Sequence, residues 1–312
     1  MMDGAALSAP VAPKPSERPQ LIKAIPVRHW GRWVSAAVLL FLAFALAWSL
    51  AHNPNVGWST IGQYLFKPLT LRGVLVTIEM TIIAMVIGIV GGTLVAVMRL
   101  SENPVLRTVA WIYIWLFRGV PLLVQIIFWG FLGALYPSLF VGIPFVGLVF
   151  AHGNTSALIG AFTAAILALG LNEVAYASEL VRAGIISVDK GQQEAALSLG
   201  MSGGLTMRLV VLPQAMRVVT PPMGNETITM LKMTSLVSVI SGRDLLTVVQ
   251  QVYSQNFKQI PLLIVASIWY LALTTVLTIG QHYLEKRFGR GFGQADTGSA
   301  ERKALKRETR NG

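Results

Sequence analysis

The chain has 312 residues, of which 54% are hydrophobic and 12% are charged, and its formal net charge is +11. A soluble domain carries about 25% charged residues, so this composition excludes an ordinary soluble protein. The absence of cysteine excludes disulfide frameworks and thiolate metal sites, and the four histidines have no ligand spacing, so no metal site is predicted.

In chain order, a proline-rich and basic N-terminus predicts a disordered cytoplasmic tail over residues 1–32. Apolar segments long enough to cross a bilayer follow. The six predicted spans are 33–50, 73–98, 109–136, 157–182, 216–241 and 260–283. The apolar stretch 139–151 is too short to span and predicts an external loop or a re-entrant segment. Residues 284–312 predict a second basic cytoplasmic tail.

The first apolar segment has two interpretations. Ala45-Leu46-Ala47 is similar to the cleavage site of a signal peptide. However, the preceding 32 residues are long for a leader, and the apolar run has no break near the site. We therefore expect residues 33–50 to be an extra N-terminal transmembrane helix, with a cleaved leader as the alternative.

The basic residues predict the orientation. With the N-terminus inside, the cytoplasmic segments hold nineteen lysines and arginines, and the external segments hold four. Cytoplasmic loops of membrane proteins are enriched in these residues. Both termini and the loop 182–217 are therefore expected in the cytoplasm. The net positive charge then reflects membrane topology, and no nucleic-acid partner is expected.

The loop 182–217 carries a distinctive pattern, KGQQEAALSLG over residues 190–200. Residues 192–199 predict a short helix in which Glu194 lies early, where the helix dipole favours an anion. Ala195 and Ala196 leave a bare flank, and Gly200 can adopt the left-handed conformation that ends a helix. These residues alone fit either a helix resting on the membrane or a surface that another protein contacts.

The spacing from Glu194 through Gly200 to Leu212-Pro213 resembles the EAA loop of ABC importer permeases. The segments FRGVPLLVQ (117–125) and AYASELVR (175–182) are similar to motifs of the polar amino acid permeases, which serve histidine, glutamine, arginine and opine importers. The resemblance covers about residues 73–290. It implies an all-α, polytopic membrane bundle with the type I ABC importer permease fold, namely a five-helix core within 73–283 plus one extra N-terminal helix.

This resemblance also implies the partners. A separate ATPase subunit dimer would contact the EAA loop through Glu194, Ala195, Ala196, Gly200, Leu212 and Pro213. The chain has no Gly-Lys dipeptide and hence no phosphate-binding P-loop, so ATP and magnesium would belong to the ATPase, and no cofactor or enzymatic activity is expected here. The resemblance further implies an external amino-acid-binding protein, a second permease copy or a paralogue, and the bacterial inner membrane.

Polar groups inside the predicted spans are candidates for function, because such groups are costly in a bilayer. The candidates for the substrate pathway are Gln125, Glu173, Tyr176, Asn225, Glu226 and Lys232. For these, lining a pathway and bracing the bundle remain equally open. Arg118 and Glu179 are expected to form a structural brace, and Gly88-x-x-x-Gly92 predicts close helix packing.

Met233 suggests a substrate charge. Relatives in the resembled family often carry aspartate or asparagine beside the lysine at this place, whereas this chain has Met233 after Lys232. We therefore expect a neutral or acidic polar amino acid rather than arginine or lysine, although the sequence does not identify the amino acid.

Two other functions are weaker: a secondary transporter would show inverted repeats, and a membrane enzyme would show a catalytic constellation, and neither is found in the sequence.

Overall fold

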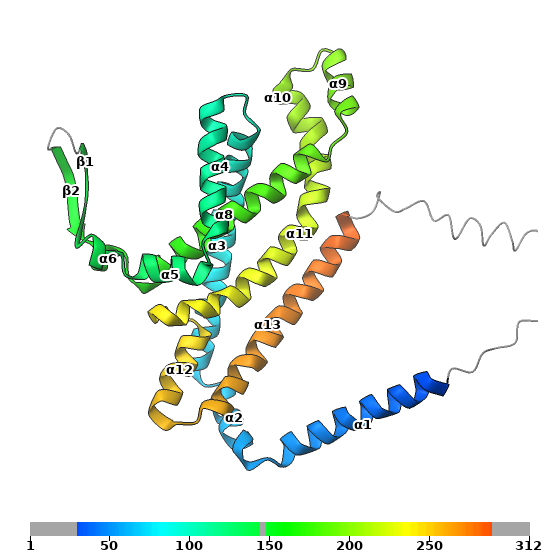
Figure 1. The fold of residues 1–312 in the computed structure, drawn as a ribbon, viewed down its shortest axis with the longest axis vertical. Helices are drawn as coiled ribbons and strands as arrows, with labels where there is room; N and C mark the ends of the chain where they lie inside the picture. Colours follow the sequence, from blue (N-terminus) through cyan, green and yellow to red (C-terminus); the bar gives the residue numbers. More distant parts are fainter. Residues whose placement is uncertain (1–29, 144–147, 289–312) are drawn as a thin grey trace, which may run out of the picture. The chain divides into compact units, whose positions relative to one another are not determined.

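The computed structural model describes residues 30–143 and 148–288 (Figure 1). The predicted tails, 1–32 and 284–312, fall almost entirely outside these residues and stay predictions. The chain divides into two units, residues 1–53 and 54–312, and each is described by itself.

The first unit contains one described helix, α1 (Trp30–His52), which includes the predicted span 33–50. Its apolar side chains surround the whole helix, and none of its residues is buried within the chain. A helix that is apolar on all sides is typical of a membrane span. The helix ends before Asn53 and Pro54, because a residue that precedes proline is disfavoured in the helical region.

The second unit is a bundle of long helices joined by short ones. In chain order its elements are η1 (Pro54–Val56), α2 (Trp58–Leu65), α3 (Pro68–Leu100), α4 (Pro104–Gly119), α5 (Leu122–Gly130), α6 (Leu132–Leu135), β1 (Ser138–Ile143), β2 (Leu148–Asn154), α7 (Thr155–Leu158), α8 (Ala161–Ile186), α9 (Lys190–Ser198), α10 (Gly203–Thr206), η2 (Met207–Val211), α11 (Leu212–Met233), η3 (Thr234–Ile240), α12 (Leu245–Asn256) and α13 (Gln259–Phe288).

Four helices in the described part of the chain are long and apolar enough to cross a membrane, namely α1, α3, α8 and α13. The bent pair of α4 and α5 adds a fifth if it is counted as one span. Helix α11 covers most of the predicted span 216–241 but is not among them, because polar residues such as Asn225, Glu226 and Lys232 interrupt it. It nevertheless packs against α3, α8 and α13 within the bundle.

The predicted span 109–136 is broken. Helix α4 ends at Gly119, α5 begins at Leu122, and the two helices are bent by 97°. Pro121 lies at the break and cannot donate a backbone hydrogen bond, and Val120 before it is extended, with φ −97° and ψ 128°. A count of apolar residues does not reveal this bend, because the residues on both sides of it remain apolar.

Helices α3 and α8 pack closely through glycine. A Cβ atom built on Gly88 would lie 2.2 Å from Cγ of Glu173, and one on Gly92 would lie 2.7 Å from Cβ of Ala177. Small residues permit such an approach between membrane helices. The packing predicted from the Gly88–Gly92 spacing is therefore confirmed.

An apolar core lies where α3, α5, α8, α11 and η3 meet. We call this set the central cluster, and its buried members are Met80, Ala84, Met85, Ile126, Ala165, Ala168, Leu169, Met230 and Val237. Most come from α3 and α8, the two helices with the most extensive mutual contact. One of its members, Met230, also lines a cavity described below.

Of the apolar stretch 139–151, predicted as a loop or a re-entrant segment, the described residues 139–143 and 148–151 lie in two antiparallel strands. Strand β1 pairs with β2 so that Ser138 faces Asn154 and Phe140 faces His152, with a register shift after Val141. The hairpin projects from the bundle next to α6 (Figure 1). Outside a helix, the backbone N–H and C=O groups of a short apolar segment need other hydrogen-bond partners. Pairing between the two strands supplies them.

Candidate functional site

The short helix of the 182–217 loop ends as its sequence predicts. At the start of α9, the Asp189 carboxylate accepts a hydrogen bond from the Gly191 amide at 2.7 Å. At its end, Gly200 has φ +81°, its amide donates to the Leu197 carbonyl, and the Met201 amide donates to the Ala196 carbonyl. These paired bonds form a Schellman motif, which requires a left-handed residue at the position of Gly200. The role predicted for Gly200 as the helix stop is confirmed.

One side of α9 is buried and the other is open. Ala196 is buried, whereas Glu194 and Ala195 are exposed. Leu197 is 51% exposed and Leu199 is 84% exposed, so an apolar surface continues past the alanine flank. The sequence pattern drew attention to the alanines and missed these leucines, although their position in a polar loop was a usable signal.

A π-helical turn, η2, connects the loop to α11, on which Leu212 and Pro213 lie. Proline has no amide hydrogen and crowds the carbonyl four residues earlier, so a regular α-helix is disfavoured here. The Gln214 side chain donates to the Val210 carbonyl at 2.9 Å. Leu212 and Pro213 remain exposed, so they lie on the accessible surface of this junction.

A cavity of about 340 Å³ lies between α8, α11 and the break between α4 and α5. We call it the inner cavity, and its lining residues are Arg118, Val120, Pro121, Leu122, Asn172, Glu173, Tyr176, Glu226, Thr229, Met230 and Met233. Two carboxyl groups, one guanidinium and one amide therefore face one space. The structure brings three predicted pathway residues, Glu173, Tyr176 and Glu226, to this cavity.

Glu173 is the most deeply buried carboxyl of the inner cavity, with 2% of its surface exposed. Its Oε1 atom is buried and has no hydrogen-bond partner among the described residues. The close approach of Gly88 fixes its side-chain stem against α3. A buried carboxyl oxygen without a donor is unfavourable, so this atom is suited to receive a donor from a ligand or from water.

Arg118 and Glu179, predicted as a brace, have other neighbours in the structure. The Arg118 guanidinium lies over the Tyr176 ring, with its Cζ 5.0 Å from the ring centroid. Glu179 instead pairs with Arg182 one turn later on α8, at 2.7 Å. The cation–π contact keeps Arg118 at the wall of the inner cavity.

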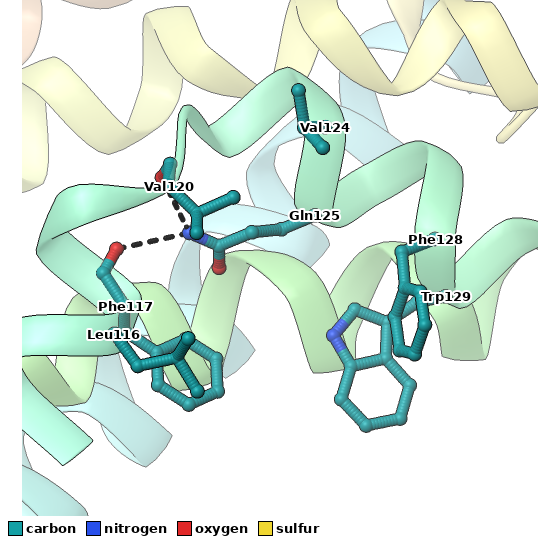
Figure 2. A pocket seen from close by; sticks show the side chains of 7 residues that line it. All are labelled: Leu116, Phe117, Val120, Val124, Gln125, Phe128 and Trp129. Atoms are coloured by element: carbon teal, nitrogen blue, oxygen red, sulfur yellow. Dashed lines mark hydrogen bonds between the residues drawn. The ribbon is translucent and has the colours of Figure 1, made fainter. Parts of the chain in front are cut away.

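Gln125 lines a different cavity, at the bend between α4 and α5. Its Nε2 donates to the carbonyls of Phe117 and Val120, both at 2.9 Å (Figure 2). The bend leaves these carbonyls without regular helical partners, so the amide replaces the missing donors. This cavity of about 350 Å³ is otherwise lined by apolar residues, including Phe128 and Trp129.

Asn225 and Lys232 are exposed and do not line the inner cavity. Thr229, Met230 and Met233 line it, because they follow Glu226 by three, four and seven positions and share its helix face. Lys232, six positions after Glu226, falls on another face. Asn172, whose Nδ2 donates to the Phe117 carbonyl at 3.0 Å, joins the cavity from α8 and was not predicted as a pathway residue.

Comparison with known proteins agrees with this architecture. Residues 88–290 match the family described as binding-protein-dependent transport system inner membrane component. The arginine transport system permease protein ArgU of Corynebacterium glutamicum is 46% identical over 278 residues, which cover 88% of this chain and 85% of that protein. The L-cystine transport system permease protein TcyB of Bacillus subtilis is 35% identical, covering 78% and 95%.

A solved structure, described as a crystal structure of an amino acid ABC transporter with histidines, aligns with a TM-score of 0.59. It is 34% identical, and the match covers 71% of this chain and 95% of the other. The predicted all-α type I importer permease fold is thereby confirmed. The chain belongs to the family of binding-protein-dependent inner membrane transport components, as a multi-pass permease subunit of an amino acid ABC transporter that is not itself an enzyme.

Proposed function

We propose that the inner cavity is part of the passage for a cationic amino acid of the arginine or lysine kind. The observation that carries this proposal is the buried Oε1 of Glu173, which has no hydrogen-bond partner among the residues described. An ammonium or guanidinium group of a ligand would supply the missing donor. A charge-assisted hydrogen bond of this kind is stronger than a neutral one.

The charges of the inner cavity match such a ligand in number. Glu173 and Glu226 supply two carboxyl groups, and Arg118 supplies one guanidinium. A cationic amino acid carries two cationic groups and one carboxylate, so each group has a counterpart of opposite charge. Glutamate would reverse this balance. The arginine transport named for the C. glutamicum relative supports the same substrate class.

The expectation of a neutral or acidic substrate rested on the missing anion at position 233, and it counted Lys232 as the cation of the pathway. Lys232 does not line the inner cavity, so we propose the cationic class from the two carboxyl groups that do line it. Met233 does line it and contributes an apolar wall beside the two carboxyl groups. Even without a carboxylate at position 233, the inner cavity holds two carboxyl groups and one guanidinium.

We also propose the arrangement of the complex. An ATPase dimer that binds ATP and magnesium contacts the exposed part of α9, including Glu194, Ala195 and Leu199, together with Leu212 and Pro213. A second copy of this chain or a paralogue completes the passage, and an external binding protein delivers the amino acid. The protein lies in the bacterial inner membrane with both termini in the cytoplasm, in line with its distribution of basic residues. No nucleic-acid partner is involved.

Uptake by the complex reconstituted with its own binding protein tests the substrate class. Labelled arginine, lysine, glutamine and glutamate are compared in the wild type, in Glu173→Gln and in a control, Glu102→Gln. Glu102 is exposed in the connection between α3 and α4 and lines none of the described cavities.

We expect arginine and lysine to be preferred in the wild type. Glu173→Gln removes one charge-assisted hydrogen bond, which is worth about 1.5–3 kcal/mol. Arginine uptake in this variant should therefore fall about tenfold or more, whereas uptake in the control should match the wild type. Faster uptake of glutamate than of arginine, or unchanged uptake by Glu173→Gln, would contradict the proposal.

A further inference from the structure

A second polar cavity lies at the end of α8 opposite the 182–217 loop. It has a volume of about 560 Å³, and residues at the start of α8, including Phe162, line it together with residues of α3 and of the turn after η3. We call it the outer cavity, because the proposed topology places this end of the bundle outside. The volume falls within the range of small-molecule sites.

Two opposite charges face the outer cavity. Glu79 of α3 and Arg243 of the turn after η3 both line it, and both are exposed. Neither residue forms an ion pair within the described part of the chain. The ion pair found in that part joins Glu179 to Arg182 on α8. Charges within membrane segments normally face a partner or a water-filled cavity. Glu79 and Arg243 are therefore available to a ligand that carries both signs of charge.

The turn that carries Arg243 has a fixed shape. Ser241 and Arg243 have φ values of 58° and 65°, in the left-handed region that side chains other than glycine rarely adopt. Gly242 between them lies so close to η3 that an added Cβ would be 2.1 Å from Cγ1 of Val237. Such backbone persists only where the surroundings impose it, and it is common at binding sites. The guanidinium of Arg243 is thus attached to a constrained backbone.

The two polar cavities lie at different depths along the same helix. Glu79 precedes Gly88 by nine residues, which corresponds to about 14 Å along α3, and Gly88 packs against Glu173 of the inner cavity. Phe162 of the outer cavity and Leu122 of the inner cavity both pack against the central cluster. An apolar layer therefore separates two sites that offer charged groups.

We infer that the outer cavity is a reception site for the zwitterionic backbone of a free α-amino acid. Glu79 binds the α-ammonium group, and Arg243 binds the α-carboxylate, for which the planar guanidinium is well suited. The site acts before the inner cavity and recognises the backbone rather than the side chain. The order of the two sites rests on the proposed function, whereas the ligand class of the outer cavity does not.

Protection of a single cysteine tests this inference, because the chain has no cysteine of its own. Ser241→Cys is placed at the wall of the outer cavity in the complete transporter complex, and its reaction with a membrane-impermeant thiol reagent is timed. The probes are L-arginine, L-glutamine, agmatine, which lacks the carboxylate, and 5-guanidinovalerate, which lacks the α-ammonium. The control is Ser254→Cys on α12, exposed and outside the lining of the outer cavity.

We expect L-arginine and L-glutamine to slow labelling at Cys introduced at position 241 severalfold, and agmatine and 5-guanidinovalerate to have no such effect at equal concentration. Adding Glu79→Gln or Arg243→Gln should abolish protection, whereas Arg72→Gln should not. Three outcomes would each overturn the inference. Labelling could be equal with and without amino acid, or protection could survive both charge substitutions. The third outcome is a Cys that never reacts because another subunit covers it.

The same variants separate this inference from the proposed function. Glu173→Gln in the Ser241→Cys background should lose arginine uptake and keep protection. Arginine uptake without protection would overturn the outer site alone. Protection in a Ser241→Cys complex that keeps Glu173 and yet does not transport arginine would overturn the cationic substrate alone.

Discussion

Gly200 holds a backbone conformation on which the end of α9 depends. Its φ of +81° costs an L-residue about 1–2 kcal/mol, although no neighbouring atom would contact an added Cβ. Asparagine tolerates this conformation better than other residues, and β-branched valine tolerates it poorly. We expect Gly200→Asn to keep most of the ATP hydrolysis stimulated by substrate-loaded binding protein, and Gly200→Val to lose most of it. The measurement is ATPase activity of the reconstituted complex, with membrane insertion verified for both variants. Equal activity of the two would show that the left-handed turn is not needed for coupling.

Gly88 makes the second residue-scale prediction. A methyl group there would meet Cγ of Glu173 at 2.2 Å, so Gly88→Ala must separate α3 from α8 or displace the glutamate. Overpacking of this kind costs about 1–3 kcal/mol. We expect a lower Tm of the detergent-solubilised protein and reduced uptake. Gly280→Ala on α13, where an added Cβ meets nothing within 4 Å, is the control and should leave both unchanged or slightly raise the Tm. Similar Tm values for both variants would contradict the packing argument.

At the scale of elements, the bend between α4 and α5 depends on Gln125. Its amide donates to Phe117 and Val120 carbonyls that the broken helix leaves in apolar surroundings. Each buried carbonyl left without a donor costs about 1–3 kcal/mol. Gln125→Leu keeps the volume and removes both bonds. Asn172 still donates to the Phe117 carbonyl, so the loss falls on the Val120 carbonyl, and we expect a lower Tm. Val124→Leu on the adjacent exposed position should change the Tm little. Equal Tm values would mean that water or lipid headgroups satisfy these carbonyls.

Whole-molecule topology is tested by cysteine accessibility. The distribution of basic residues predicts that position 55 lies outside and position 195 lies inside. In intact cells, an impermeant thiol reagent should label Asn55→Cys and spare Ala195→Cys, and after permeabilisation it should label both. The opposite pattern would overturn the proposed orientation.

Much of this molecule could be predicted from its sequence, for identifiable reasons. Long apolar runs determine the membrane class, and the end of α9 follows from one glycine whose conformation other residues avoid. The bend at Pro121 was missed, because apolar periodicity is the same on both sides of a break. The hairpin was missed because a short apolar run does not distinguish a strand of six or seven residues from a loop.

Part of the inner cavity could be predicted, because polar residues within apolar spans stand out in the sequence. Glu173, Tyr176 and Glu226 meet because burial forces polar groups of neighbouring helices together. Lys232 was predicted with them as a charged residue of the same span, but its place six positions after Glu226 puts it on another face of α11.

The length of α3 has a consequence for the lipid around the protein. Its 33 residues correspond to about 50 Å, whereas the acyl-chain region of a typical bilayer is about 30 Å thick. Such a helix must lean, emerge into the headgroups or stretch the lipid beside it. Because α8 is locked to α3 through glycine contacts, a change in the lean of α3 also moves Glu173. The acyl-chain length of the host membrane is therefore coupled to the position of a buried carboxyl group that lines the inner cavity.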